Sequence, residues 1–158
     1  MKKLFFVLIT SICISQNSKA QAAKSIYFEL GGPGLASFNF DTRFSPKEGG
    51  IGGRIGFGGF YVGDVGALFI PIGINYLMGK DNRNYFELGG GVTPVFISDD
   101  SDFGSGNFTE TFGHLIFGYR LQPPNGGFTF RAFICPVFNT NGFIPYYGGV
   151  SFGYKFGK

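Results

Sequence analysis

Apolar and polar residues alternate one by one along nearly the whole chain after residue 22, and this pattern limits the fold more than any other feature. Near its start, Ile26, Phe28 and Leu30 alternate with Tyr27 and Glu29. Successive side chains of a β-strand point to opposite faces, so a period of two predicts strands with one apolar face. Turn residues interrupt the pattern seven times, at 31–34, 45–49, 62–64, 80–84, 98–107, 122–127 and 139–142. The chain therefore predicts eight strands, most of them about ten residues long.

The makeup of the two faces separates a membrane barrel from a soluble sandwich. One face carries large apolar side chains, and the other is mostly Gly, Ser, Thr and Asn with one or two charges per strand. A soluble sheet exposes Lys and Glu freely, whereas small polar side chains suit the lumen of a narrow barrel. Segments of this length match tilted membrane-spanning strands, and closure pairs every backbone group that lipid cannot hydrate. We therefore predict an all-β fold, an eight-stranded antiparallel up-and-down transmembrane β-barrel.

The first 22 residues have the three parts of a secretory signal peptide. Lys2 and Lys3 form a basic start, residues 4–14 form an apolar run, and Ala20 and Ala22 mark a small-residue cleavage site. The apolar run is too short for a transmembrane helix, which needs about 20 residues. We predict a signal peptide at 1–22 and the outer-membrane barrel at 23–158.

Removal of this signal would also remove the excess of basic charge. The whole chain has 13 Lys and Arg against 10 Asp and Glu, and Lys2, Lys3 and Lys19 would leave with the signal. The mature chain is then formally neutral, so its charge gives no reason to expect a nucleic-acid partner. Cys135 would be the only cysteine left, which excludes an intramolecular disulfide.

An even number of strands puts both chain ends on one side of the membrane, which in outer-membrane barrels is the periplasm. The short turns at 45–49, 80–84 and 122–127 then face the periplasm, and the longest connection, 98–107, lies outside. We predict a location in the outer membrane of a Gram-negative bacterium, with outer-membrane lipid and lipopolysaccharide as neighbours. The sequence leaves the oligomeric state open.

Charged residues on the polar face form the most informative candidate site. An eight-stranded barrel is just wide enough inside for side chains to fill it, and buried charges need partners of opposite sign. We therefore predict a structural salt-bridge network that plugs the lumen, with a conduction path as the alternative. The predicted members are Glu29, Glu87 and Glu110 with Arg54, Arg120, Arg131 and Lys155.

Two further features have a structural and a functional interpretation. His114 lies on the same polar face without a nucleophile at a recognisable spacing, so we expect a hydrogen-bonded lumen histidine. The alternative is a lipid hydrolase that uses a serine and this histidine. Asp99, Asp100 and Asp102 lack the spacing of a calcium loop, so we expect a solvated loop, with a cation bridge to lipopolysaccharide phosphate as the alternative. We predict no catalytic residue, cofactor or metal centre.

Three sequence segments carry a resemblance to a known family. Phe-Glu-Leu-Gly-Gly occurs at 28–32 and 86–90, Pro-Ile-Gly-Ile-Asn-Tyr-Leu at 71–77, and Arg-Leu-Gln-Pro-Pro at 120–124. Over nearly all of residues 24–158 the chain resembles the small outer-membrane β-barrel proteins common in Bacteroidota-type bacteria. The resemblance implies fold and location and transfers no functional residues. The end, 153–156, is similar to the aromatic-ended last strand of such proteins, which implies recognition by the barrel-assembly machinery, although Gly157 and Lys158 follow.

These observations favour a non-enzymatic barrel of the outer membrane with a structural or interaction role and a filled lumen. The alternatives are a narrow porin-like channel for small solutes, a membrane-embedded lipid-modifying enzyme, and a soluble periplasmic lipocalin-like barrel. Neither a ligand nor a specific protein partner can be named from the residues.

Overall fold

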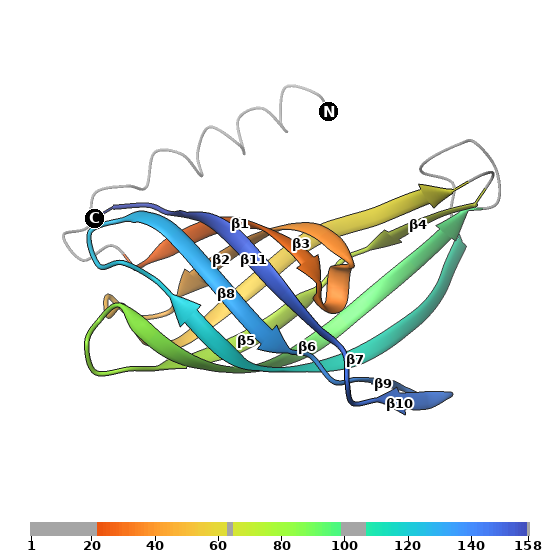
Figure 1. Cartoon of the computed structure of the whole chain (residues 1–158). Coiled ribbons are helices and arrows are strands. Elements are labelled where there is room, and N and C mark those ends of the chain that lie inside the picture. Colours follow the sequence, from red (N-terminus) through yellow and green to blue (C-terminus); the bar gives the residue numbers. More distant parts are fainter. Residues whose placement is uncertain (1–21, 63–64, 99–106, 158) are drawn as a thin grey trace, which may run out of the picture.

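A computed structural model describes residues 22–62, 65–98 and 107–157, and its strands form a single sheet that closes into a barrel (Figure 1). The elements are β1 (Lys24–Gly31), η1 (Gly32–Gly34), β2 (Ala36–Arg43), β3 (Gly50–Val62), β4 (Val65–Phe69), β5 (Ile72–Met78), β6 (Asn84–Ser98), β7 (Asn107–Leu121), β8 (Gly127–Ile134), β9 (Val137–Asn139), β10 (Gly142–Ile144) and β11 (Gly148–Lys155). The described residues do not include the acidic loop with Asp99, Asp100 and Asp102. Of the signal peptide predicted at 1–22, they include only Ala22.

The barrel has eight strands because some of these elements are parts of one strand. β4 and β5 both pair with β3 and β6, and they are separated at Ile70 and Pro71. Proline has no N–H to give to a ladder, so an interruption is expected there. β8 and β9 both pair with β7, and β10 leads into β11. Every pairing is antiparallel, so the predicted eight-stranded antiparallel barrel is confirmed.

The first and last strands close the barrel. β1 pairs with β11 over seven residue pairs, from Ser25 with Lys155 to Gly31 with Gly149. The backbone N–H of Phe156 also donates to the carbonyl of Lys24, 2.9 Å away. Both ends of the described barrel therefore lie at the same end of the cylinder, which we call the inner end, opposite the outer end that carries η1, β9 and β10 (Figure 1). No helix within the described ranges is long and apolar enough to cross a membrane.

The barrel wall has an apolar outside and a polar inside. Phe38, Phe57 and Ile74 point outward and are about 60% exposed, whereas Glu29 and Arg120 point inward and are fully buried. A soluble barrel has the opposite arrangement, since water would face the polar side chains. An apolar outside around a narrow polar lumen is the arrangement expected of a barrel that hydrocarbon surrounds.

Inward-facing glycines make room for large inward-facing side chains on the neighbouring strand. Gly52, Gly56 and Gly153 stand opposite Arg43, Asn39 and Tyr27 in the ladders. At each of these glycines an added Cβ would overlap the neighbouring side chain or its backbone. The glycines of the lumen face therefore serve packing, as in other closed barrels.

A single added methyl group tests this packing. We expect Gly56→Ala to lower the stability of the folded barrel by about 1–3 kcal/mol, because the new Cβ overlaps the side-chain oxygen of Asn39. Gly142→Ala is the matched control, since an added Cβ there meets no atom within 4 Å. Urea titrations read by circular dichroism measure the difference. Equal stability of the two variants would contradict the packing role.

The carboxylate of Asp81 stabilises the β5–β6 turn at the inner end. Asp81 accepts hydrogen bonds from the side-chain amide of Asn84 at 2.5 Å and from the backbone N–H groups of Arg83 and Asn84 at 3.0 and 2.7 Å. The side-chain amide of Asn84, followed by these two backbone donors, lowers the pKa of Asp81 to about 2. The turn therefore keeps its charged, hydrogen-bonded form throughout the neutral pH range.

Candidate functional site

Seven charged side chains of alternating sign form one continuous chain of contacts across the lumen. They come from β1, β2, β3, β6, β7 and β8, and all point inward. We call this set the lumen network, and its order is Arg54, Glu29, Arg131, Glu87, Arg120, Asp41 and Arg43.

Arg131 is the centre of this network. Its Nε and Nη2 donate to the two oxygens of Glu87, both at 2.8 Å, which is the bidentate geometry that makes Arg–carboxylate pairs strong. Its Nη1 donates to Glu29 Oε2 at 2.9 Å. The other oxygen of Glu29 accepts a hydrogen bond from Arg54 Nη2, also at 2.9 Å. Two carboxylates on different strands are thus bridged by a single guanidinium.

Asp41 organises the other end of the network. Its Oδ1 accepts from Arg43 at 2.6 Å and from Arg120 at 3.0 Å, and its Oδ2 accepts from the amide of Asn75 at 2.6 Å. The same amide nitrogen lies 3.1 Å from Glu87 Oε1, which links the two halves. Arg120 Nη1 is 3.8 Å from Glu87 Oε1. The network therefore ties β1, β2, β3, β5, β6, β7 and β8 together from inside.

Two aromatic rings, those of Tyr27 and Phe133, add to the packing of the network. The Arg131 guanidinium lies 4.7 Å from the ring centre of Tyr27 and 5.0 Å from that of Phe133, and Arg54 lies 5.9 Å from Tyr27. These distances are within the range of cation–π contact. Buried guanidinium groups gain stabilisation from the ring faces where oxygens do not reach them.

Lys155 belongs to a second cluster at the inner end. Its Nζ lies 2.6 Å from Glu48 Oε2 and donates to the carbonyls of Pro123 and Pro124 at 3.0 and 2.6 Å. Gln122 donates to the carbonyl of Glu48 at 2.9 Å. This cluster joins the β2–β3 turn to the β7–β8 turn and to β11, so Lys155 is buried but does not contact the lumen network.

Two of the predicted network residues lie outside the lumen network, Lys155 in the cluster at the inner end and Glu110 near the outer end. Glu110 is exposed at the outer end of β7, and its carboxylate accepts hydrogen bonds from the amides of Asn139 and Asn141. The prediction for Glu110 was wrong because alternation gives the face of a strand and not the height, and Glu110 lies too far toward the outer end to reach the lumen network.

His114 lies inside the barrel and is 1% exposed. Its Nδ1 is 3.2 Å from the hydroxyl of Thr93, and its Nε2 is buried without a hydrogen-bond partner among the described residues. This contact orients the imidazole ring. The partner is a threonine, however, and not the serine of the lipid-hydrolase alternative. No group of three or more His, Cys, Asp or Glu side chains in the described ranges could hold a metal ion.

Asp41 and Arg43 of the network, and Asn75, which is hydrogen-bonded to it, were not among the predicted members. Their positions on the polar faces of 37–43 and 71–75 were a usable signal, since Asp41 and Arg43 alternate with Phe40 and Thr42. What the sequence does not contain is the stagger of the strands, which brings Asp41 level with Arg120, 79 residues away.

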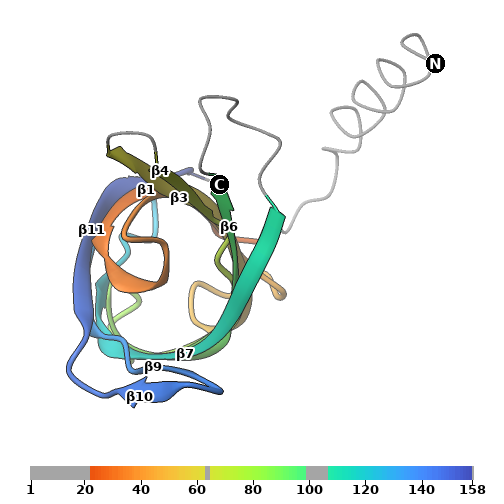
Figure 2. The same cartoon turned by 90° about the vertical axis from the view of Figure 1, so that its right-hand side faces the viewer.

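The turn between β1 and β2 folds into the barrel and fills its outer part. Gly32, Pro33 and Gly34 of η1 are all buried, and Figure 2 shows this connection inside the ring of strands. Gly31 donates to the carbonyl of Leu35 at 2.6 Å, and Leu35 has a φ of 58°. A left-handed conformation is uncommon for leucine, so the hydrogen bonds of this turn hold Leu35 where it is.

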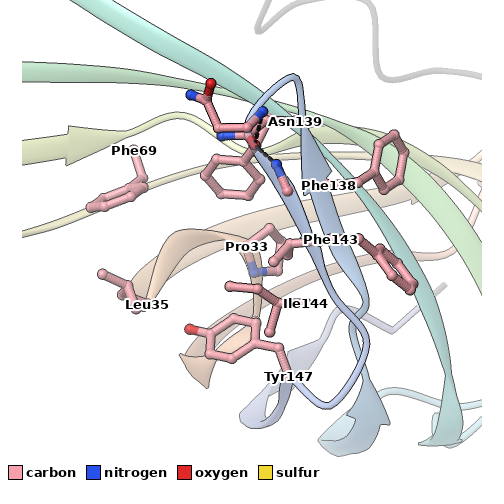
Figure 3. A pocket seen from close by; sticks show the side chains of 13 residues that line it. Pro33, Leu35, Phe69, Phe138, Asn139, Phe143, Ile144 and Tyr147 are labelled. Carbon is pink, nitrogen blue, oxygen red and sulfur yellow. Dashed lines mark hydrogen bonds between the residues drawn. The ribbon is translucent and has the colours of Figure 1, made fainter.

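An apolar pocket of about 550 Å³ lies at the outer end beside η1. In Figure 3, Leu35 and Phe69 lie on one side of it and Phe138 and Phe143 on the other, with Pro33 and Ile144 between them. Asn139 and Asn141 supply polar atoms at its border. We call this cavity the mouth pocket; sequence reasoning did not identify it.

Comparison with solved structures shows the fold of outer-membrane barrels. The N-terminal β-barrel domain of Pseudomonas aeruginosa OprF matches with a TM-score of 0.60 and 10% identity, over 89% of this chain and 100% of that chain. The Yersinia pestis outer membrane protein Ail, solved in a phospholipid bilayer nanodisc, matches with a TM-score of 0.57 and 15% identity, over 87% and 99%. The outer membrane enzyme PagL reaches a TM-score of only 0.41. No protein-family profile and no curated protein matches the chain.

Proposed function

We propose that the protein is an integral outer-membrane barrel with a sealed lumen, which acts as a rigid membrane scaffold and not as a solute channel or an enzyme. The observation that carries the proposal is the lumen network, a continuous chain of seven alternating charges that spans the interior. The apolar outer face and the fold shared with outer-membrane barrels support the location.

The energetics of the network support a seal. A permeating solute would have to separate charges such as Arg131 and Glu87, which lie 2.8 Å apart and are about 1% exposed. Breaking a buried ion pair leaves an uncompensated charge and costs about 3–5 kcal/mol. Above the network, η1 fills the lumen on the outer side, so a solute would meet a second obstruction.

The outer face and the last strand indicate which molecules the barrel contacts. Outer-membrane lipid and lipopolysaccharide cover the exposed aromatic and aliphatic side chains in this proposal. On β11, Phe152 and Tyr154 point outward and Phe156 follows, and we propose that the barrel-assembly machinery recognises this aromatic edge.

Conductance separates a seal from a channel. We expect the folded protein to insert into planar lipid bilayers without current steps above the baseline, while a general porin under the same conditions conducts. Insertion is checked independently by resistance of the membrane-bound protein to carbonate extraction. Stable, uniform current steps from carbonate-resistant protein would overturn the sealed lumen, and release by carbonate would overturn the integral location.

A further inference from the structure

The outer rim of the barrel has a notch on one side. β11, β1 and β2 end at Gly148, Gly31 and Ala36, whereas β3 continues to Val62, four residues beyond its last ladder pair with β2 at Gly58. Four strand residues extend about 13 Å. On the other side of the notch, β10 pairs only with β9 among the described elements, and Figure 2 shows β10 outside the ring. Between β10 and β3 the described strands therefore end lower than β3 does.

The mouth pocket opens at this notch. Its floor is η1, with Pro33 and Leu35, and its inner wall carries Phe69 and Phe112. Val137 and Ile144, which pair across the β9–β10 hairpin, form its outer border. Phe69 is almost fully buried, whereas Ile144 is 59% exposed, so the pocket leads from the surface into the barrel.

The height of the notch places it in the hydrocarbon layer. β1 and β2 have eight residues each. A strand of that length, tilted by about 40°, rises about 20 Å, which is less than the apolar band of about 25 Å on outer-membrane barrels. The aromatic side chains around the notch, Phe60, Phe138 and Phe143, are 43–62% exposed. The apolar outer surface therefore reaches the border of the pocket at Phe138, Phe143 and Ile144.

We infer that the mouth pocket takes one hydrocarbon chain of an outer-leaflet lipid, which enters sideways through the notch. The inference rests on the proposed membrane location. An apolar lining with two amides at one border suits an alkyl chain whose polar end stays near Asn139 and Asn141. A cavity of this size and lining would be poorly hydrated in water, and lipid is the apolar molecule present at its opening.

Photolabelling inside vesicles tests this inference. The folded protein is reconstituted with phosphatidylcholine that carries a diazirine near the end of one acyl chain, and labelled peptides are mapped by mass spectrometry. We expect adducts on Phe69 and Phe112, which face the interior, besides adducts on the outward-facing Phe38 and Ile74. Labelling of Phe38 and Ile74 without Phe69 and Phe112 would overturn the inference. Absence of all four adducts would instead overturn the membrane location.

Charged variants at the notch give the matched comparison. Ile144→Asp places a carboxylate at the pocket border, and we expect about tenfold less labelling of Phe69 with unchanged labelling of Ile74. Leu35→Asp is a second variant, because Leu35 lines the pocket beside η1. Val62→Asp is the control, since Val62 is 72% exposed at the same end but does not line the pocket. An equal loss in all three variants, or no loss in either pocket variant, would count against lipid entry at the notch.

Discussion

Replacing Arg131 by methionine is expected to destabilise the folded barrel by about 3–5 kcal/mol, because the change leaves two buried carboxylates short of their shared partner. Arg131 makes three charged hydrogen bonds of 2.8–2.9 Å to Glu29 and Glu87. Methionine has a similar length and keeps the apolar contact with Tyr27, so the loss is mainly electrostatic. Since the chain has no tryptophan, urea titration is followed by circular dichroism and by the mobility of unheated protein in gels.

Two companion variants distinguish the network from a general effect of losing a positive charge. Arg83→Met removes a guanidinium from the exposed β5–β6 turn and should leave the unfolding midpoint unchanged. Adding Glu87→Gln to Arg131→Met removes the negative charge of Glu87, which the loss of Arg131 leaves without its partner. The double variant should therefore be more stable than the sum of the two single losses predicts. Additive losses would show that Arg131 and Glu87 act independently.

Much of the fold can be predicted from the sequence because the two faces of each strand meet different surroundings. Ile26 and Leu30 point outward and Tyr27 and Glu29 point inward, so a register shift of one residue would exchange the two faces of the strand. The turn signals gave the strand count for the same reason, since each marks a place where alternation stops. The interruption at Pro71 has a local cause, because proline has no N–H for the ladder. The inward fold of η1 depends on contacts with distant residues, which no local pattern indicates.

The candidate site could be predicted only as far as strand faces determine it. Glu29, Arg54, Glu87, Arg120 and Arg131 were assigned to the lumen by alternation, and the structure brings them into contact. Asp41 enters the same network, and Glu110 does not, because contact also requires equal height along the axis. Height follows from the stagger of all eight strands around the closed barrel, which is a property of the ring and not of any segment. The notch and the mouth pocket also depend on the stagger of the strands, so no single segment predicts them.

A lysine on the outer face tests whether that face contacts lipid. Ile74 is 60% exposed in the middle of β5, level with the inward-facing Asn75 of the lumen network. We expect Ile74→Lys to destabilise the barrel in phospholipid by about 2–4 kcal/mol, the cost of a lysine near the centre of a bilayer. Met78→Lys, at the end of the same strand beside the β5–β6 turn, should cost at most about 1 kcal/mol, because depth sets the penalty.

The stabilities of Ile74→Lys and Met78→Lys in lipid and in detergent identify the cause of the destabilisation. Reversible unfolding from vesicles compares the two variants in lipid, and the same titration is repeated after transfer to a short-chain detergent. Thinner, more mobile hydrocarbon lets the lysine amine reach water, so the difference between Ile74→Lys and Met78→Lys should shrink. A difference that stays the same in both media would locate the defect in packing within the wall, and equal stability in lipid would contradict a lipid-facing Ile74.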